Sequence, residues 1–247
     1  MSGNDQAVTA AVLVIGDEVL SGRTKDRNIG YIAEYLTAIG IDVREARVVP
    51  DVAGEIAEAV NALRARFAYV FTTGGIGPTH DDITADSIAQ AFGIGIDVDP
   101  RAVAMMKARY SEADLTPARL RMARIPEGAS LIENAVSGAP GFRVENVIVM
   151  AGVPKIMQAM LDAVAPTLEG GKPMLSQTRS GPIKEGDIAE ALGTLQQRYP
   201  DTMMGSYPGY GDKGFHTSIV VRARDETLLA EAIGEVEKLI ASAQAGR

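Results

Sequence analysis

The feature that most constrains the fold is an alternation of short apolar runs with segments of helical periodicity over residues 10–93. Residues 10–16 form an apolar run that ends in glycine, which is typical of a buried strand. From Asn28 apolar side chains recur every three or four residues up to Gly40, which predicts an amphipathic helix ending at that glycine. The same alternation predicts strands over 41–49 and 69–73, and helices over 56–63 and 84–92. It therefore indicates βαβ units and an α/β fold with a mostly parallel sheet.

The rest of the chain divides at a stretch rich in proline and glycine, residues 166–173. We expect one domain over 1–168 and a second, small α+β module over 172–247. In the first, helices are predicted over 100–112, 117–124 and 154–164, and strands over 130–133, 142–145 and 147–150. In the second, the predicted order is a strand over 174–178, a helix over 184–199, strands over 203–207 and 215–223, and a helix capped by Asp225. This order is βαββα.

Composition limits the classes of protein to consider. Hydrophobic residues make up 46% of 247, which is enough to bury a sizeable core. The absence of cysteine excludes disulfides, thiolate metal sites and cysteine nucleophiles. Residues 1–6 are polar and do not resemble a signal peptide, and the longest apolar runs are too short to cross a bilayer. We therefore expect a soluble, cytoplasmic protein with no membrane partner.

Charge limits the partners. The formal net charge is −8, and no basic run is visible of the kind that grips a phosphate backbone, so we expect no nucleic-acid partner. A small anionic ligand needs only a few amides and a cation, and is compatible with this charge. Because the chain has only two histidines, a metal would be held by oxygen ligands.

Residues 72–84 are the richest segment for chemistry. Three glycines in four positions, Gly74, Gly75 and Gly77, let the backbone approach a ligand and turn its N–H groups outward. The helix start that follows adds partial positive charge, and the threonine hydroxyls of this segment, including Thr73 and Thr79, add donors. This predicts a cradle for phosphate or carboxylate. The alternative is a plain strand-to-helix turn that uses glycine for its backbone angles.

Carboxylates are predicted at the same sheet edge. Asp17 and Glu18 follow the first strand, Asp51 follows the second, and Asp81 and Asp82 follow the glycine segment. Ligands of parallel sheets bind at the carboxyl ends of the strands, where these loops meet. Carboxylates beside an anion cradle imply a cation between them, so the pattern predicts a divalent-metal-dependent phosphate-ester or anhydride site. The alternative is that Asp51 and Asp82 only cap helices, and both roles can coexist.

Other polar residues are assigned weaker roles. His80 is either a base or, as we favour, a solvent-facing loop residue, and His216 is assigned none. Residues 137–141, which include Gly141, and residues 152–154 are turns first, and they can also present backbone amides to a ligand. Two methionine pairs, 105–106 and 203–204, are expected to fill core gaps.

These motifs together resemble a known family. Residues 16–22 (GDEVLSG), 26–28 (DRN) and 73–84 (TGGIGPTHDDIT) resemble the N-terminal domain of the CinA proteins, a domain similar to the molybdopterin-binding proteins MogA and MoaB and to the N-terminal half of eukaryotic FAD synthases. Residues 139–142 and 152–154 fit as well, and 206–208 (SYP) resembles the module that follows in CinA. The likeness covers about residues 8–165 most strongly.

The resemblance implies a three-layer sheet with helices on both faces, and a molybdopterin- or nucleotide-like ligand at the loop from Thr73 to Asp82. It implies that Asp51 and Asp82 serve catalysis and bind Mg²⁺, Mn²⁺ or Co²⁺. Asp17 and Ser21 would border the site. The activity implied is metal-dependent hydrolysis of an adenylyl phosphoanhydride such as ADP-ribose.

Two alternatives stay open: a molybdopterin adenylyltransferase-like enzyme, or a module that binds molybdopterin without turnover. The partners expected are a small nucleotide or pterin and further copies of the chain in a homo-oligomer. Two departures from the family pattern matter. The sequence ends before the C-terminal deamidase domain of full CinA proteins, so we expect no amidohydrolase activity, and Ala151 stands where the family has proline.

Overall fold

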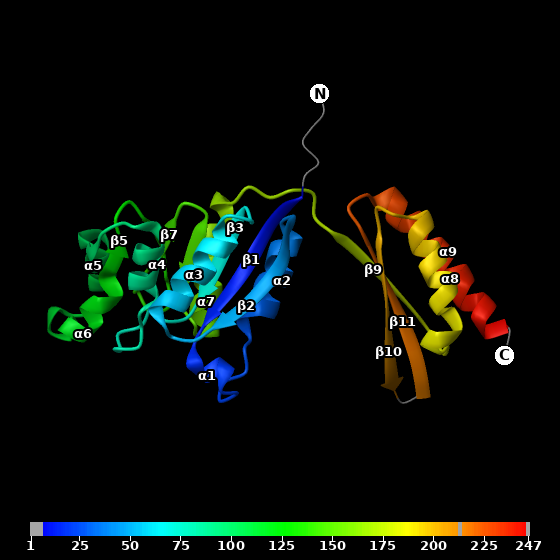
Figure 1. Cartoon of the computed structure of the whole chain (residues 1–247), viewed down its shortest axis with the longest axis horizontal. Helices are drawn as coiled ribbons and strands as arrows, with labels where there is room; N and C mark the ends of the chain where they lie inside the picture. The colour runs from blue at the N-terminus through cyan, green and yellow to red at the C-terminus, as the bar shows by residue number, and fades with distance from the viewer. Residues whose placement is uncertain (1–6, 212–213, 246–247) are drawn as a thin grey trace, which may run out of the picture. The chain divides into compact units, whose positions relative to one another are not determined.

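The computed structural model describes residues 7–211 and 214–245, and they form two compact units, Met1–Gly171 and Lys172–Arg247 (Figure 1). Each unit is described by itself. Among the described residues, no helix is both long enough and apolar enough to cross a membrane.

The first unit is built on a six-stranded sheet in the order β2-β1-β3-β8-β7-β6 (Figure 1). The strands are β1 (Val8–Ile15), β2 (Ile41–Val49), β3 (Tyr69–Thr73), β6 (Ser130–Ile132), β7 (Gly141–Val144) and β8 (Val147–Met150). Neighbours among β2, β1, β3 and β8 pair in parallel, whereas β7 pairs antiparallel with both β8 and β6. The predicted mostly parallel sheet is therefore confirmed.

Helices cover both faces of this sheet, which confirms the three-layer arrangement. The helices are α2 (Asn28–Ala38), α3 (Ala53–Arg64), α4 (Thr84–Phe92), α5 (Pro100–Lys107) and α7 (Pro154–Val164). On one face, Leu13 and Ile15 of β1 share a core with buried residues of α3, α4 and α5. On the other face, Val12 and Val14 of the same strand share a core with α2 and α7. The two-residue period of β1 thus feeds both cores.

Several short elements differ from the sequence prediction. The loop after β1 contains a one-turn helix, α1 (Asp17–Leu20), and the helices predicted over 100–112 and 117–124 are shorter, α5 ending at Lys107 and α6 (Pro117–Leu120) giving way to a 3₁₀ turn. Most of the residues between α5 and α6 are exposed, and only Tyr110 and Leu115 among them pack against the core. A two-stranded ribbon of β4 (Ile96–Val98) and β5 (Arg124–Pro126) was not predicted, because three residues are too few to show an alternation.

Helix ends follow local chemistry. Gly93 closes α4 with a left-handed φ of 65°, as predicted. Asp99 caps α5, its carboxylate accepting the N–H of Arg101 at 2.7 Å and pairing with the Arg101 guanidinium at 2.6 Å. Pro100 follows at the first helical position, where its missing N–H costs nothing.

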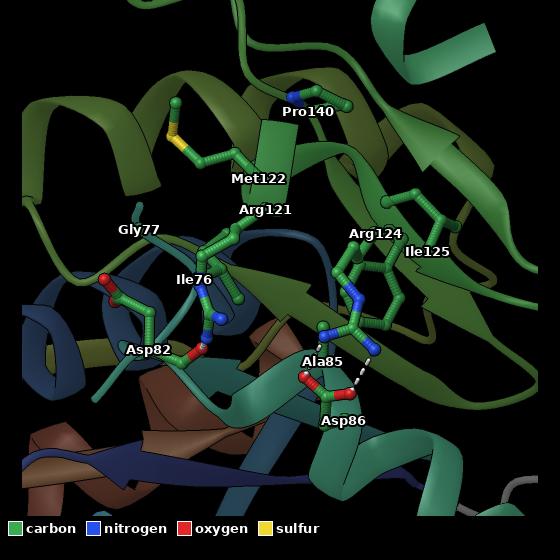
Figure 2. Close-up of a pocket in the computed structure, with 12 residues that line it drawn as sticks. Ile76, Gly77, Asp82, Ala85, Asp86, Arg121, Met122, Arg124, Ile125 and Pro140 are labelled. Carbon is green, nitrogen blue, oxygen red and sulfur yellow. Dashed lines mark hydrogen bonds and ion pairs between the residues drawn. The ribbon is translucent and has the colours of Figure 1, made fainter. Parts of the chain in front are cut away.

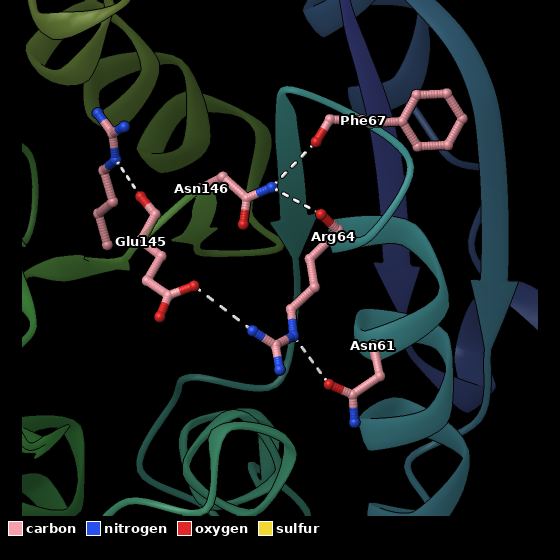
Figure 3. A network of polar contacts seen from close by, with 6 residues as sticks. Asn61, Arg64, Phe67, Glu145 and Asn146 are labelled. Atoms are coloured by element: carbon pink, nitrogen blue, oxygen red, sulfur yellow. Dashed lines mark hydrogen bonds and ion pairs between the residues drawn. The ribbon is translucent and has the colours of Figure 1, made fainter.

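The hairpin of β7 and β8 is tied to α3 at its two-residue turn (Figure 3). Glu145 adopts a positive φ of 49°. The Asn146 amide donates to the carbonyls of Arg64 at 3.0 Å and Phe67 at 2.9 Å, and these satisfy main-chain acceptors at the end of α3. The guanidinium of Arg64 reaches Glu145 at 3.5 Å and Asn61 at 2.8 Å. This network fixes the sheet end remote from the loops after β1, β3 and β8.

The second unit has the predicted βαββα order. Its elements are β9 (Leu175–Gly181), α8 (Glu185–Arg198), β10 (Met203–Gly211), β11 (Gly214–Ala223) and α9 (Glu226–Ala245). The antiparallel sheet runs β10-β11-β9, and buried residues of β11 pack with α8 and α9. The carboxylate of Asp225 accepts the N–H of Leu228 at 2.8 Å, so the predicted cap is confirmed.

Candidate functional site

A groove of about 440 Å³ lies where the loops after β1, β3 and β8 meet the segment before β7. We call it the loop groove, and it is lined by Glu18, Thr24, Gly74, Gly75, Ile76, Gly77, Asp82, Met122, Asn134, Ser137, Ala139, Ala151, Gly152, Val153, Pro154, Ile156 and Met160. Three of these loops follow parallel strands at their carboxyl ends, where ligands of such sheets bind. The glycine segment and the two turns at 137–141 and 152–154 are thus brought together, as the sequence suggested.

The glycine segment is held so closely that side chains would not fit. Gly74 has a φ of 107°, and a Cβ there would lie 2.1 Å from the Ile15 carbonyl oxygen. Gly75 has a φ of 66°, and a Cβ would lie 2.2 Å from the Thr84 hydroxyl oxygen. That hydroxyl donates to the Gly74 carbonyl at 2.9 Å, and the Thr84 N–H donates to the Gly75 carbonyl at 3.0 Å. Thr84 therefore holds the backbone of Gly74 and Gly75 in place through these two hydrogen bonds.

Asp82 lines the loop groove and does not cap α4. The N-terminal cap position is Ile83, with no side-chain capping bond, so the interpretation of Asp82 as a helix cap was wrong. Instead Oδ2 of Asp82 accepts the N–H of Thr79 at 2.8 Å and also its hydroxyl. A Cβ at Gly77 would lie 2.6 Å from Asp82 Oδ2 and 2.9 Å from Oδ1. Glycine at 77 is thus what admits this carboxylate beside the loop.

Asp51 is also not a helix cap. The cap position of α3 is Val52 with no side-chain bond, because Oδ2 of Asp51 accepts the N–H of Asp17 at 2.9 Å. Burial raises the pKa of Asp51, the Asp17 N–H opposes that rise, and repulsion from Asp17, Glu18 and Asp81 adds to it. Four carboxylates, those of Asp17, Glu18, Asp51 and Asp81, therefore lie near one another at the carboxyl ends of the strands. Asp51 itself does not line the loop groove.

The other predicted ligand-binding residues are placed as follows. Gly74, Gly75 and Gly77 line the loop groove. Thr73 is buried behind it, its hydroxyl without a hydrogen-bond partner among the described residues, and Gly141 is buried where a Cβ would lie 2.4 Å from the Val149 carbonyl oxygen.

Nearer the surface, Thr79 orients Asp82, and the exposed Asp17 and Ser21 belong to the turn that bears Glu18. His80 is 98% exposed, in agreement with the solvent-facing alternative.

Two buried asparagines support the groove from within. The Asn28 side-chain amide, at the start of α2, donates to the Gly152 carbonyl at 2.8 Å, and its Oδ1 is buried with no hydrogen-bond partner in the part of the chain that the structure describes. Asn134 donates to the Ala139 carbonyl at 2.8 Å and accepts from the N–H groups of Val136 and Ser137. Each asparagine fixes the shape of one loop that lines the groove.

Sequence reasoning did not single out Thr24, Met122, Asn134, Ile156 or Met160, and it left Glu18 among general acidic residues. The apolar members carry no signal of their own because they look like core residues. Asn134 carries no sequence signal either, because only the fold shows that it is buried and must find hydrogen-bond partners.

A small side pocket adjoins the loop groove (Figure 2). The two share Gly75, Ile76, Gly77, Asp82 and Met122 in their linings. Arg124 lines the side pocket and pairs bidentately with Asp86, at 2.7 and 3.2 Å. Arg121 also lines it, and among the described residues the only hydrogen bond of its side chain is from Nη2 to the Asp82 main-chain carbonyl at 3.5 Å.

The described residues contain no group of three or more carboxylates, histidines or cysteines arranged to hold a metal ion unaided. Glu18 and Asp82 do line one groove with the backbone of Gly74–Gly77. Mg²⁺ commonly takes one or two carboxylates and completes its shell with phosphate oxygens and water. The donor set therefore fits a cation that arrives with a phosphate ligand, and does not fit a protein-only metal cage.

Comparison with known proteins places this fold and groove in a family. Residues 11–170 match the probable molybdopterin binding domain, and residues 173–245 match the middle domain of FAD synthase. A protein of Thermoplasma acidophilum is 42% identical over 92% of this chain and 88% of its own length. The crystal structure of the protein CinA from the same organism, described as of unknown function, covers 65% of this chain and 98% of that one, with 41% identity and a TM-score of 0.62.

A probable FAD synthase of Caenorhabditis elegans is 29% identical over 96% of this chain, which matches 50% of that protein's length. The family match spans most of the first unit, and the relative from Thermoplasma matches nearly the whole chain. The chain therefore belongs to the probable molybdopterin binding domain family, as a CinA-type member that carries a second unit like the middle domain of FAD synthase.

Proposed function

We propose that this protein binds an adenylyl phosphoanhydride in the loop groove and hydrolyses it with a divalent cation, ADP-ribose being the expected substrate. The observation that carries the proposal is the presence of Glu18 and Asp82 in one groove with the backbone of Gly74–Gly77. Its volume, about 440 Å³, is in the range of ligand clefts, roughly 300–1,000 Å³.

Each part of the groove has a chemical role in the proposal. The backbone of Gly74–Gly77 approaches the phosphates, as only glycines allow at these φ angles and contacts. Asp82 presents Oδ1 to the cation while Thr79 holds Oδ2. A bound cation would neutralise phosphate charge and orient a water molecule. Asp51, with its raised pKa, holds the turn that carries Glu18 and lies close to the carboxylates of Asp17, Glu18 and Asp81.

The reaction is the addition of water across the phosphoanhydride. One P–O bond of the bridge breaks, water supplies the new oxygen, and ADP-ribose gives AMP and ribose 5-phosphate. The likeness of the second unit to the middle domain of FAD synthase supports a nucleotide-related role.

The family match favours a second candidate, in which the groove takes molybdopterin. In that case the protein transfers an adenylyl group to the pterin with consumption of ATP, or binds the pterin without turnover. The three readings differ in product: AMP from ADP-ribose, pyrophosphate release from ATP with pterin present, or no product.

The test is AMP release from ADP-ribose with Mg²⁺, Mn²⁺ or Co²⁺, measured by chromatography for the native protein, Asp82→Asn and Asp97→Asn. Asp97 is exposed, and its carboxylate accepts the N–H of Val98 away from the groove, so it is a matched charge control. We expect metal-dependent AMP from the native protein and from Asp97→Asn, and at least a hundredfold less from Asp82→Asn.

Absence of AMP from folded native protein with every metal would refute the hydrolase. Thermal shift with molybdopterin and ATP would then decide between the remaining readings. Stabilisation by the pterin alone would favour a binding module.

A further inference from the structure

Two arginines lie near the glycine segment, and they differ in whether a carboxylate neutralises them. Carboxylates of Asp17, Glu18, Asp51 and Asp81 gather at one edge of the site, Asp82 lines the loop groove, and two arginines, Arg121 and Arg124, line the adjoining side pocket. Arg124 is neutralised by its bidentate pair with Asp86. Arg121 forms no ion pair within residues 7–211 and 214–245. It is therefore a positive charge left over beside a surface suited to a phosphate.

The hydrogen bonding of the Arg121 guanidinium is also incomplete. Its Nε is buried without a partner among the described residues. A buried donor without an acceptor is unfavourable, so structures rarely keep one unless something else supplies the acceptor. Its Nη2 contact with the Asp82 carbonyl, at 3.5 Å, is at the outer limit for a hydrogen bond and holds the guanidinium weakly.

The position of Arg121 is also specific. Figure 2 shows its guanidinium beside Ile76 and Asp82, at the place where the side pocket and the loop groove share their linings. To bind an anion lying along Gly75–Gly77, this weakly held side chain would move from the side pocket toward the loop groove. Guanidinium groups bind phosphate oxygens by charge-assisted, often bidentate, hydrogen bonds.

We propose that Arg121 is a specificity-determining residue, which binds a phosphate group of the ligand in the loop groove and makes the groove select phosphorylated over unphosphorylated ligands. The choice of adenylyl probes below rests on the proposed function. The selection of phosphate does not, because it would serve a hydrolase, a transferase and a pterin-binding module equally.

The test compares the affinities of AMP and adenosine by isothermal titration calorimetry, with inorganic pyrophosphate as a third probe. The variants are Arg121→Gln, which removes the charge, and Arg121→Lys, which keeps it without the planar fork. Arg119→Gln is the matched control, because Arg119 lies two residues away, is exposed and contacts Asp114 and Tyr110 instead of the groove. Circular dichroism and thermal unfolding confirm that each variant folds.

We expect Arg121→Gln to weaken AMP and pyrophosphate by about tenfold or more and to leave adenosine unchanged. Arg121→Lys should recover part of that loss, and Arg119→Gln should match the native protein. Equal losses for AMP and adenosine would mean that Arg121 only supports the fold of the groove, and would overturn the proposal. So would unchanged AMP affinity, or failure of the native protein to prefer AMP over adenosine.

A separate turnover assay distinguishes this proposal from the hydrolase. Phosphate binding that depends on Arg121, with no AMP formed from ADP-ribose, would refute the hydrolase and keep the role of Arg121. Metal-dependent AMP formation with an unchanged KM in Arg121→Gln would do the reverse.

Discussion

Oδ2 of Asp51 accepts the backbone N–H of Asp17 at 2.9 Å, and so joins the end of β2 to the first turn of α1. The bond spans 34 residues of sequence and sets the turn that brings Glu18 to the loop groove. It places a carboxylate in a half-buried position among three others, where burial first, and then repulsion, raise its pKa.

Asp51→Asn should therefore stabilise the protein near neutral pH. The amide oxygen can still accept the Asp17 N–H, whereas the charge that suffers burial and repulsion is gone. We expect an increase in Tm of about 1–3 °C, together with loss of any activity that needs the carboxylate. Differential scanning calorimetry and the AMP assay measure the two effects on one preparation.

The sign of the pH dependence gives a second check on Asp51. Its folded pKa lies above the ordinary value of 3.8, so the folded state binds this proton more tightly than the unfolded chain. Stability from this group falls as the pH rises from about 3.8 through the raised value. The advantage of Asp51→Asn should be absent at the acid end of that window and complete above it; a constant difference across the window would show that the pKa is not raised.

Gly74→Ala should destabilise the first unit. The new Cβ would meet the Ile15 carbonyl at 2.1 Å, and the φ of 107° is one that alanine rarely adopts. Strain of this kind costs about 1–3 kcal/mol, which lowers Tm by roughly 2–10 °C. Urea unfolding measures it, with Gly54→Ala as the control because a Cβ at Gly54 meets nothing within 4 Å.

Gly77→Ala should separate stability from function. Its Cβ would crowd the carboxylate of Asp82, and that side chain can turn away. We expect a change in Tm of about 2 °C or less and a large loss of metal-dependent turnover, comparable to that of Asp82→Asn. Retention of turnover would mean that the position of Asp82 beside the loop does not matter to the reaction.

Asp99→Ala should weaken the α5 region by about 1 kcal/mol, because it removes the cap on Arg101. The hydrogen bond from the Arg101 side chain is the main reason that the pKa of Asp99 is lowered. Its contribution is therefore present above the ordinary value of 3.8 and is lost as the pH falls through the lowered value. The stabilities of native and variant protein should converge at low pH, as for the Asp51 pair, but at higher pH the native protein is here the more stable of the two.

Asn28→Asp tests the support under the Gly152 loop. An ionised carboxylate cannot donate to the Gly152 carbonyl, so the 2.8 Å bond is lost and two acceptors face each other. We expect a loss of stability of about 1–3 kcal/mol and weaker AMP binding. Asn61→Asp, at an exposed site on α3, is the matched control, and an equal effect there would refute the special role of Asn28.

The elements that could be predicted from sequence are those whose side chains repeat. The eight residues of β1 and the apolar stripe of α2 have enough turns or alternations to reveal their faces. The ribbon of β4 and β5 has three residues on each strand and is defined by pairing between segments that are distant in sequence. Such pairing leaves no periodic trace.

The candidate site shows the same limit. Gly74, Gly75 and Gly77 could be singled out because three glycines in four positions directly follow a predicted strand, although the sequence alone left a plain turn open as the alternative. The helix-capping predictions for Asp51 and Asp82 failed because their carboxylates accept the N–H groups of Asp17 and Thr79, which lie outside α3 and α4. Arg121 could not be distinguished from other surface arginines, since only the fold reveals that its charge is left without a carboxylate.

The close approach of Gly152 to Gly74, where a Cβ would lie 3.2 Å from the Gly74 Cα, means that the floor of the groove is made of main chain from two loops in contact. The rim is made of side chains such as those of Met122, Ser137 and Val153, and none of these three residues is fully buried. Floor and rim can therefore change independently in evolution or in the laboratory. A library of variants confined to the rim side chains could change which ligand binds, while the main-chain surface proposed to contact the phosphate stays the same.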